Sequence, residues 1–257
     1  MVTSSSLGKL GRMANGMFQI AASIGTASAN NDNAVFPAWK YMNPVLFKHP
    51  IDQSLSEKDI SFQYYEQSFG YSPIPYIRNM SLNGYFQSEK YFSHCSPLIR
   101  HSFEPSDILL TNLKLKYSGI LDGTTCSIHV RRGDYINPEF TMHDVCNRLY
   151  FNRAVTHVIN NVQIDTFLVF SDDIEWCRIN MDQSFVFISG NSDIEDMFLM
   201  SLCTHNIICN SSFSWWGSWL NKNTSKIIVA PDKWFRDEFD MNYADIYTPE
   251  MVKISTT

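Results

Sequence analysis

The chain has 257 residues, which is enough for one large domain or two smaller ones with a sizeable hydrophobic core. Hydrophobic residues make up 44% and charged residues 18%, as in an ordinary globular protein. The net charge of −6 argues against a polyanion-binding protein, so no nucleic-acid partner is expected. A phosphate contact would have to be a local basic site, which favours a small anionic ligand.

The chain shows no signal peptide and no membrane span. Its longest nearly uncharged segment, residues 13–31, is too rich in small and polar residues to cross a bilayer. Six cysteines without a C-x-x-C pair argue against zinc and redox motifs and favour reduced thiols, although the even count leaves disulfides open. We expect a cytoplasmic location, or the Golgi lumen or membrane if an anchor has been removed from a eukaryotic protein.

The N-terminal part of the chain is irregular and contains one clear helical pattern. Residues 14–29 predict a helix rich in small residues, which begins in the glycine-containing turn "GRMANGMFQ". Connections rich in proline and aromatic residues follow. We predict that residues 1–115 form an N-terminal domain.

From about residue 120 the pattern changes to strands alternating with helices, which predicts a doubly wound parallel sheet in an α/β domain over residues 116–257. The predicted helices cover residues 146–161, 194–203 and 213–220. The predicted strands cover residues 126–130, 167–171, 185–189, 206–209 and 227–230.

Ligands of such sheets bind beyond the carboxyl ends of the strands. The first predicted strand ends in "HVRRGDY", where His129 and Arg131 share one face and Arg132 points to the other. Arg131 could therefore bind a diphosphate through its guanidinium fork, with His129 beside it. We expect Arg132 to pair with Asp134; the alternative is that both arginines form structural salt bridges only.

The stretch "NSSFSWWGSWLN" follows the fourth strand and opens a helix, with Asn210 or Ser211 as its N-cap. Backbone N–H groups and hydroxyls converge at such a helix N-terminus, which makes a ready phosphate site. The alternative is capping alone. Three tryptophans in this helix are expected in the core.

Two further strand ends carry carboxylates. Ser192 and Glu195 form a capping box, and the helix behind them is apolar, so Asp196 is a carboxylate in an apolar neighbourhood. Asp196 could accept hydrogen bonds from the N1–H and N2–H groups of guanine, or its charge could merely interact favourably with the helix dipole. Asp172 and Asp173 could bind a metal, cap a helix or hold a ribose.

These segments together resemble the α-1,2-fucosyltransferases of glycosyltransferase family 11, in family order and over most of the chain. Ala14 and Gly16 depart from that pattern, where the family has Gly and Gln. The segments that carry the resemblance are "GRMANGMFQIA" (11–21), "GYFQSEKYF" (84–92), "HVRRGDY" (129–135), "VFSDDIEWC" (169–177) and "GNSDIEDMFLMSLCTHNIICNSSFSWWGSWLN" (190–221).

The resemblance implies a GT-B fold of two Rossmann-like domains, an acceptor-side domain and a GDP-fucose-binding domain. It also implies inversion at the sugar carbon and no metal or other cofactor. Arg12, Asn15 and Gln19 match the family's N-terminal loop. The residues matching or flanking its donor site are His129, Arg131, Asp172, Asp173, Asp196, Asn210, Ser211, Ser212, Phe213 and Ser214.

The expected partners are a nucleotide sugar and an oligosaccharide acceptor; peripheral membrane association and the oligomeric state stay open. A base must deprotonate the acceptor hydroxyl, and the candidates are Glu139 and His143, with Asp134 behind them. Two alternatives remain: a metal-dependent GT-A enzyme using Asp172 and Asp173, and a catalytically impaired carbohydrate-binding homologue.

Overall fold

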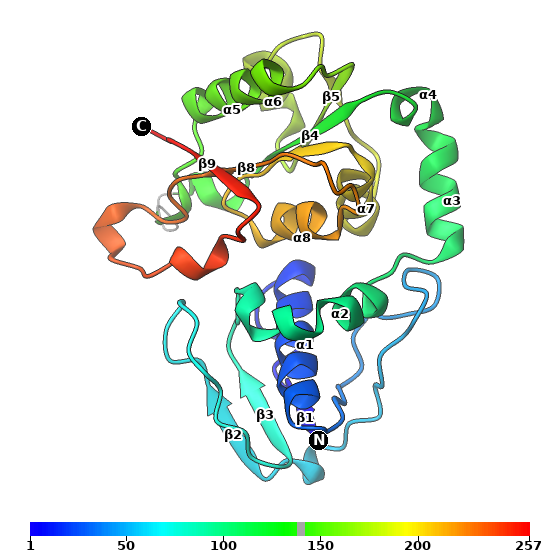
Figure 1. Ribbon diagram of the computed structural model, residues 1–257, viewed down its shortest axis with the longest axis vertical. Helices are drawn as coiled ribbons and strands as arrows, with labels where there is room; N and C mark the ends of the chain where they lie inside the picture. The colour runs from blue at the N-terminus through cyan, green and yellow to red at the C-terminus, as the bar shows by residue number, and fades with distance from the viewer. Residues whose placement is uncertain (138–141) are drawn as a thin grey trace. The chain divides into compact units, whose positions relative to one another are not determined.

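The computed structural model describes residues 1–137 and 142–257, which form two compact units. The first unit comprises residues 1–109 and 242–248, and the second comprises residues 110–241 and 249–257. Figure 1 colours the chain from its blue N-terminus to its red C-terminus. The division falls in helix α3 (Asp107–Lys116), and the segment 242–248 returns from the C-terminal part of the chain to the first unit.

The first unit is built on a small parallel sheet with the strand order β1-β3-β2. Helix α1 is almost entirely buried, and its small residues allow close packing: a Cβ on Gly25 would lie 2.2 Å from the carbonyl oxygen of Tyr91. The predicted helix at 14–29 is confirmed. The elements are β1 (Val2–Thr3), α1 (Met13–Ala29), β2 (Phe62–Tyr65), β3 (Met80–Asn83) and α2 (Ser96–Ser102).

The second unit contains six parallel strands in the order β6-β5-β4-β7-β8-β9. Numbered within the unit, this order is 3-2-1-4-5-6, the arrangement of a doubly wound Rossmann sheet. The strands are β4 (Thr125–Val130), β5 (Thr166–Ser171), β6 (Val186–Phe187), β7 (His205–Ile207), β8 (Ile228–Pro231) and β9 (Met251–Ile254). All five predicted strands are present, and β9 was not predicted.

Helices cover both faces of this sheet, with α5 and α6 on one side and α7 and α8 on the other (Figure 1). The helices are α4 (Ser118–Leu121), α5 (Arg148–Asn161), α6 (Ile174–Asn180), α7 (Asp193–Leu202) and α8 (Ser212–Leu220). The short 3₁₀ turns of the two units are Glu57–Asp59, Glu89–Tyr91, Ser93–Cys95, Asp134–Ile136, Asp237–Phe239 and Ala244–Ile246.

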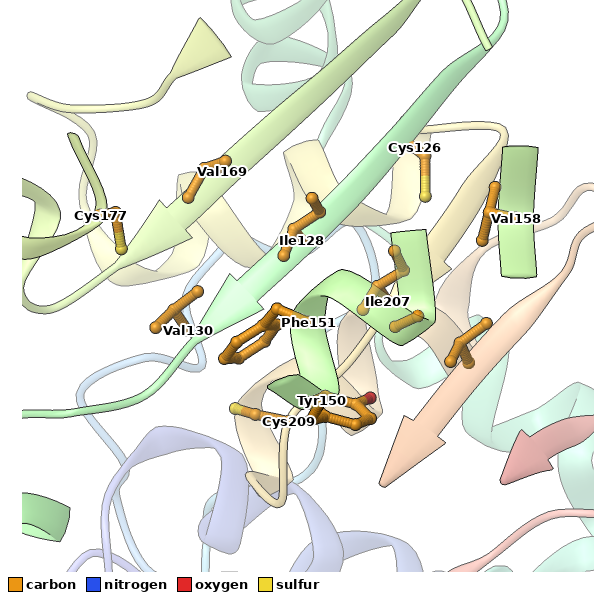
Figure 2. Close-up of a cluster of buried hydrophobic side chains, with 12 residues drawn as sticks. Cys126, Ile128, Val130, Tyr150, Phe151, Val158, Val169, Cys177, Ile207 and Cys209 are labelled. Atoms are coloured by element: carbon orange, nitrogen blue, oxygen red, sulfur yellow. The ribbon is translucent and has the colours of Figure 1, made fainter. Parts of the chain in front are cut away.

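The core between the sheet and α5 explains the alternation along β4. Ile128 and Val130 point into this core, toward Tyr150 and Phe151 of α5 (Figure 2). Because side chains alternate along a strand, His129 lies on the opposite face, where its ring contacts Phe213 of α8 at 5.2 Å. The strand therefore delivers one histidine to the α8 side of the sheet, at its carboxyl end.

The structure bears on three further expectations. All six cysteines are free thiols. Among the described residues, no helix has both the length and the hydropathy that a bilayer crossing requires. The three tryptophans of α8 are buried, as expected.

Candidate functional site

The centre of the six-stranded sheet is a topological switch point. Strands β4 and β7 are neighbours, and the chain leaves β4 toward β5 on one side and β7 toward β8 on the other. Ligands of doubly wound sheets bind in the crevice at this point, beyond the carboxyl ends of the strands. The loop after β4 carries Arg131 and Arg132, and the loop after β7 leads directly into α8.

His129 is buried beside this switch point. Its Nδ1 atom lies 3.1 Å from the Sγ atom of Cys209, which follows β7. Burial, reinforced by the positive charge of Arg131, lowers the pKa of His129 to about 3, so the ring is neutral at physiological pH. The other ring nitrogen, Nε2, has no hydrogen-bond partner within residues 1–137 and 142–257, and it is the atom that can serve a ligand.

Arg131 is held by two carboxylates. Its Nε and Nη2 atoms donate to Oδ1 of Asp134 at 3.0 and 2.6 Å, and its Nη1 atom lies 2.8 Å from Oδ2 of Asp172. A guanidinium group has five N–H donors, so these three contacts leave two donors for a ligand. The Arg131 side chain is 17% exposed, and its orientation is fixed from two loops.

The structure pairs the second arginine differently from our expectation. Asp134 is held by Arg131, while the Nε atom of Arg132 donates to Oδ2 of Asp173 at 3.1 Å. The Arg132 guanidinium also stacks on the ring of Trp176 at 4.0 Å. The expected Arg132–Asp134 pair overlooked β5, the neighbouring strand, whose carboxyl end brings Asp173 alongside the arginine.

The two aspartates after β5 organise the arginine loop. Oδ1 of Asp172 accepts the backbone N–H of Arg132 at 2.9 Å, and a Cβ on Gly133 would lie 2.4 Å from Oδ2 of Asp172. Asp173 is the N-cap of α6 and accepts the backbone N–H of Trp176. The capping alternative for Asp173 is confirmed, and both carboxylates are engaged by arginines.

The N-terminus of α8 lies at the end of β7, and Ser211 is its N-cap, as one of the two alternatives predicted. The Ser211 hydroxyl accepts the N–H of Phe213, and the Ser214 hydroxyl donates to backbone oxygens of Cys209 and Ser211. These hydroxyls therefore serve the turn itself. The partial positive charge of the first helical turn, which includes Ser212, is available for an anion.

Asn210 in this loop links separate segments of the chain through hydrogen bonds. Its buried amide donates to the backbone oxygens of His143 and Trp234, each at 2.9 Å, while its own backbone oxygen accepts the hydroxyl of Tyr135 at 3.1 Å. Tyr135 and His143 are thereby tied to the loop after β7. The segment Asn210-Ser211-Ser212 matches the N-glycosylation sequon, but Asn210 is only 1% exposed and is therefore inaccessible.

Asp196 lies in the first turn of α7, behind the capping box of Ser192 and Glu195, which is confirmed. Burial raises the pKa of Asp196 to about 6, against a hydrogen bond from the Asn191 amide at 2.8 Å. Asn191 in turn accepts hydrogen bonds from Lys116 and Tyr117. The Asp196 carboxylate is therefore partly desolvated and costly to ionise. Shifted pKa values of this kind are typical of functional sites, which favours a ligand-binding role for Asp196 over a purely structural one.

Of the three candidate bases, His143 and Asp134 are described, and the carboxylate of Asp134 is bonded to Arg131. Glu139 lies outside the described residues. His143 stacks on Tyr135 with ring centroids 4.5 Å apart, and its Nδ1 atom is buried without a hydrogen-bond partner in the described part of the chain. Burial lowers the pKa of His143, Arg131 adds to this effect, and Asp134 opposes it. The ring is therefore neutral near pH 7.

The N-terminal loop residues belong to the first unit. Asn15 accepts the side-chain amide of Gln87 at 2.9 Å, and buried Gln19 donates to the backbone oxygen of Leu10 at 3.0 Å. Arg12 is the exposed N-cap of α1. Gly16 packs against Trp39, whose ring would lie 2.9 Å from an added Cβ, so the indole fills the space next to the position where the family has Gln.

One cluster of metal-ligand types occurs among residues 1–137 and 142–257: His49, His101 and Glu104, with ligand atoms within 4.8 Å of one another. The two imidazole rings stack in parallel, with centroids 3.6 Å apart and planes at 20°. Imidazole lone pairs lie in the ring plane, so stacked rings do not direct them onto one ion. This cluster is not a metal site in the observed geometry.

Sequence reasoning missed three residues of the site: Cys209, Tyr135 and Asn191. Each of the three contacts a predicted residue or its loop, but no spacing in the sequence marks any of them as a site residue. The sequence predicted only a reduced thiol for Cys209 and no role for Tyr135 or Asn191.

Comparisons with known proteins identify one family and several relatives. The profile of glycosyl transferase family 11 matches residues 13–255. An Escherichia coli α-1,2-colitosyltransferase is 36% identical over 66% of this chain, and the chain covers 61% of that relative's length. A galactoside α-(1,2)-fucosyltransferase 2 of Oryctolagus cuniculus is 27% identical over 96% of this chain and 75% of its own length.

Among solved structures, the NodZ α-1,6-fucosyltransferase of Bradyrhizobium, in crystals soaked with GDP-fucose, is similar with a TM-score of 0.56. The match covers 90% of this chain and 94% of that one, at 14% identity, and therefore shows the fold alone. The two units with parallel sheets have the GT-B type of fold, as the similar fucosyltransferase structure does. The chain belongs to glycosyl transferase family 11.

Proposed function

We propose that this protein is an inverting α-1,2-fucosyltransferase that moves L-fucose from GDP-fucose to a hydroxyl of a galactoside in a glycan acceptor. The observation that carries the proposal is the presence of two anion-binding groups at the switch point, the Arg131 guanidinium and the N-terminus of α8. Arg131 keeps two N–H groups free of its carboxylate partners, and the N-terminus of α8 follows the neighbouring strand. A diphosphate suits this combination of a guanidinium fork and a helix dipole.

The chemistry follows from where charge develops. As the bond between fucose and the diphosphate breaks, negative charge gathers on the leaving phosphate. Arg131 and the first turn of α8 would stabilise that charge without a metal ion. Asp172 and Asp173, the carboxylates that could have bound a metal, are engaged by Arg131 and Arg132. The fold is of the GT-B type, which also argues against the GT-A alternative.

Asp196 would recognise the guanine base of the nucleotide through hydrogen bonds. A carboxylate with one oxygen bonded to Asn191 retains acceptor capacity for the N1–H and N2–H donors of guanine. Its burial makes the charged form costly, so a two-pronged donor that satisfies it gains more than it would from an exposed carboxylate. A general base, His143 or Glu139, would take the proton of the acceptor hydroxyl.

The donor sugar has a second candidate because the relatives differ in it. One relative is named for colitose and others for fucose, all in α-1,2 linkage. The features that carry our proposal bind the diphosphate and the base, which any GDP-sugar shares. We keep fucose as the proposed sugar, since the relative that matches 96% of this chain is a fucosyltransferase.

A non-enzymatic carbohydrate-binding role is the remaining alternative, and it is motivated by Ala14 and Gly16. In the structure, Gly16 accommodates Trp39, which changes the surface of α1 relative to a glutamine at that position. Such a protein would bind a GDP-sugar or a glycan without turnover. Because all six cysteines are free thiols, we also propose a reducing compartment.

The deciding experiment is an acceptor screen with GDP-fucose, with a nucleotide-activated colitose as a parallel donor arm. The product linkage is read by NMR. We expect transfer of fucose to the 2-hydroxyl of a terminal galactoside, and no transfer by Arg131→Ala. Turnover only with colitose would correct the donor; GDP binding without turnover for any acceptor would support the carbohydrate-binding alternative.

A further inference from the structure

A thiol and an imidazole meet at the switch point of the second unit. The Sγ atom of Cys209 lies 3.1 Å from Nδ1 of His129, which is within hydrogen-bond distance for sulfur. Both residues are buried, at 0% and 4% exposure. Cys209 follows β7 and His129 lies near the end of β4, so the contact joins the two central strands. Figure 2 shows Cys209 at the edge of the core, close to Tyr150.

Both groups are neutral in this environment. Burial raises the pKa of the Cys209 thiol to about 12, and burial lowers the pKa of His129 to about 3. A neutral imidazole carries one proton, which lies either on Nδ1 or on Nε2. The contact therefore has two forms: the thiol donates to Nδ1 and the ring proton is on Nε2, or Nδ1–H donates to the sulfur.

The donor and acceptor strengths of the two groups select between these forms. Sulfur is a weak hydrogen-bond acceptor, whereas Nδ1 of a neutral imidazole accepts through a lone pair, so the thiol serves better as the donor of this bond. The Ser214 hydroxyl, 3.9 Å away, turns its proton to the backbone oxygens of Cys209 and Ser211. The Cys209 sulfur therefore offers its S–H proton to Nδ1 of His129.

We propose that Cys209 is a positioning residue, whose thiol donates to Nδ1 of His129 and so holds the ring proton on Nε2. The Nε2–H group is then a hydrogen-bond donor for a phosphate oxygen of the nucleotide sugar. Phosphate oxygens only accept, so the opposite tautomer would present a lone pair to them and repel them. The role of the phosphate rests on the proposed function, whereas the tautomer does not.

Three variants test this assignment. Cys209→Ala removes the donor, and Cys209→Ser restores a hydroxyl donor at the same position. Cys126→Ala is the matched control: Cys126 is on the same strand as His129, is equally buried, belongs to the same core cluster, and its sulfur contacts the backbone oxygen of Ser127. A loss common to Cys209→Ala and Cys126→Ala reports a cavity in the core, which both substitutions create.

The primary measurement is the ¹⁵N spectrum of histidine-labelled protein, with the His129 signals assigned by a His129→Gln variant. We expect an unprotonated Nδ1 and a protonated Nε2 in the wild type and in Cys209→Ser, and mixed tautomers in Cys209→Ala. Addition of GDP should shift the Nε2 signal more than the Nδ1 signal. A wild-type spectrum with the proton on Nδ1 overturns the proposal, even if Cys209→Ala fails to fold.

Kinetics provide the second measurement. Cys209→Ala should lower kcat/KM for the GDP-sugar about tenfold or more, as is typical when the partner that orients a histidine is lost. Cys209→Ser should recover to within about threefold of the wild type, on the same scale. A rate loss without a change of tautomer would make Cys209 structural and contradict the proposal. If the wild type transfers no sugar, the proposed function fails, and the spectra still decide the tautomer.

Discussion

Two nitrogen atoms of Arg131, Nε and Nη2, donate to the same carboxylate oxygen of Asp134, at 3.0 and 2.6 Å. Asp134 follows Gly133 in a 3₁₀ turn, and its side chain is 41% exposed, whereas Arg131 is mostly buried. The carboxylate therefore fixes one edge of the guanidinium from the solvent side. We assign to the donor diphosphate the two N–H groups that Asp134 and Asp172 leave unbonded, one on Nη1 and one on Nη2.

Asp134→Ala should lower turnover while leaving stability nearly unchanged. Misorientation of the guanidinium would cost roughly 10- to 100-fold in kcat. The ion pair is partly exposed, so its loss should cost less than about 1 kcal/mol of unfolding free energy. Steady-state kinetics and thermal melts check both outcomes. Asp237→Ala, which removes an exposed pair with Lys233, is the control and should change neither. Unchanged kcat for Asp134→Ala would mean that Asp172 alone orients Arg131.

Binding of GDP should depend on the ionisation of Asp196. Guanine N1–H and N2–H donate hydrogen bonds, so they require the carboxylate form. Burial raises the pKa of Asp196 to about 6, and GDP affinity should therefore fall as the pH decreases through that value. Calorimetric titration between pH 5 and 8 measures this profile. Asp196→Asn should bind GDP weakly and without the pH dependence; a wild-type affinity that is flat across pH 6 would remove Asp196 from the base site.

The same residue should show a stability effect of opposite sign. The pKa of Asp196 is raised in the folded state from its ordinary value of 3.8, so folding favours the protonated form. Stability linked to this group is present below about pH 4 and is lost as the pH rises through about 6. Asp196→Asn should therefore melt at a higher temperature than the wild type at pH 7.5, and the difference should shrink toward pH 5.

The alternating pattern of the second unit could be predicted because its strands are short apolar runs between clear helices. The same pattern located the capping box at Ser192 and limited the N-cap of α8 to Asn210 or Ser211, since both depend on neighbours in sequence. Strand β9, Met251–Ile254, was missed because it has an edge position with exposed residues and no hydrophobic run. Strand β1 was not predicted either, although Val2 and Thr3 pair with β3.

Contacts between strand ends could not be predicted, because they depend on which strands are neighbours. The pairing of Arg132 with Asp173 requires β5 beside β4, and the contact of His129 with Cys209 requires β7 on the other side. Periodicity gave the face of each residue but no strand order. The sequence therefore named most of the candidate site while assigning Asp134 to the wrong arginine.

Chelation should leave the activity intact. Asp172 and Asp173 are engaged by arginines, and a metal ion would have to displace those guanidinium groups. We expect kcat in excess EDTA to match the untreated enzyme within about twofold, a change of less than about half a kcal/mol in barrier. The assay measures transfer from GDP-fucose with and without added Mn²⁺. Activity that disappears with EDTA and returns with Mn²⁺ would show that Arg131 and α8 do not suffice.

The general base should be separable from donor binding. His143→Ala or Glu139→Gln should reduce kcat about 10²- to 10⁴-fold while GDP affinity stays unchanged. For His143, the neutral ring expected near pH 7 is the form that can accept a proton. Because Asn210 bonds the backbone and not the ring of His143, its loop attachment survives the substitution. Wild-type turnover in both variants would place the base elsewhere, including the first unit.

The two adjacent arginines should respond differently to the same conservative substitution. Arg131→Lys replaces a planar fork, which can make two parallel bonds to phosphate, with a point charge. The charge that it meets grows in the transition state, so the loss should affect kcat as well as donor binding. Loss of one such donor typically costs about 3 to 4 kcal/mol, or roughly 10²- to 10³-fold in rate. Arg131→Lys should therefore fold normally and be nearly inactive.

Arg132→Lys should instead lose stability, with a milder effect on the rate. Lysine cannot keep both the stacking on Trp176 and the bond from Nε to Asp173, and we expect a loss of about 1 kcal/mol in unfolding free energy. Its backbone bond to Asp172 survives, so the loop should keep its course. Steady-state kinetics and thermal melts of both variants provide the test. If Arg131→Lys keeps more than about a tenth of the wild-type kcat/KM, or if Arg132→Lys is the inactive variant, the diphosphate does not bind Arg131. A tenfold loss corresponds to only about 1.4 kcal/mol, which is too little for a guanidinium that stabilises the charge developing in the transition state.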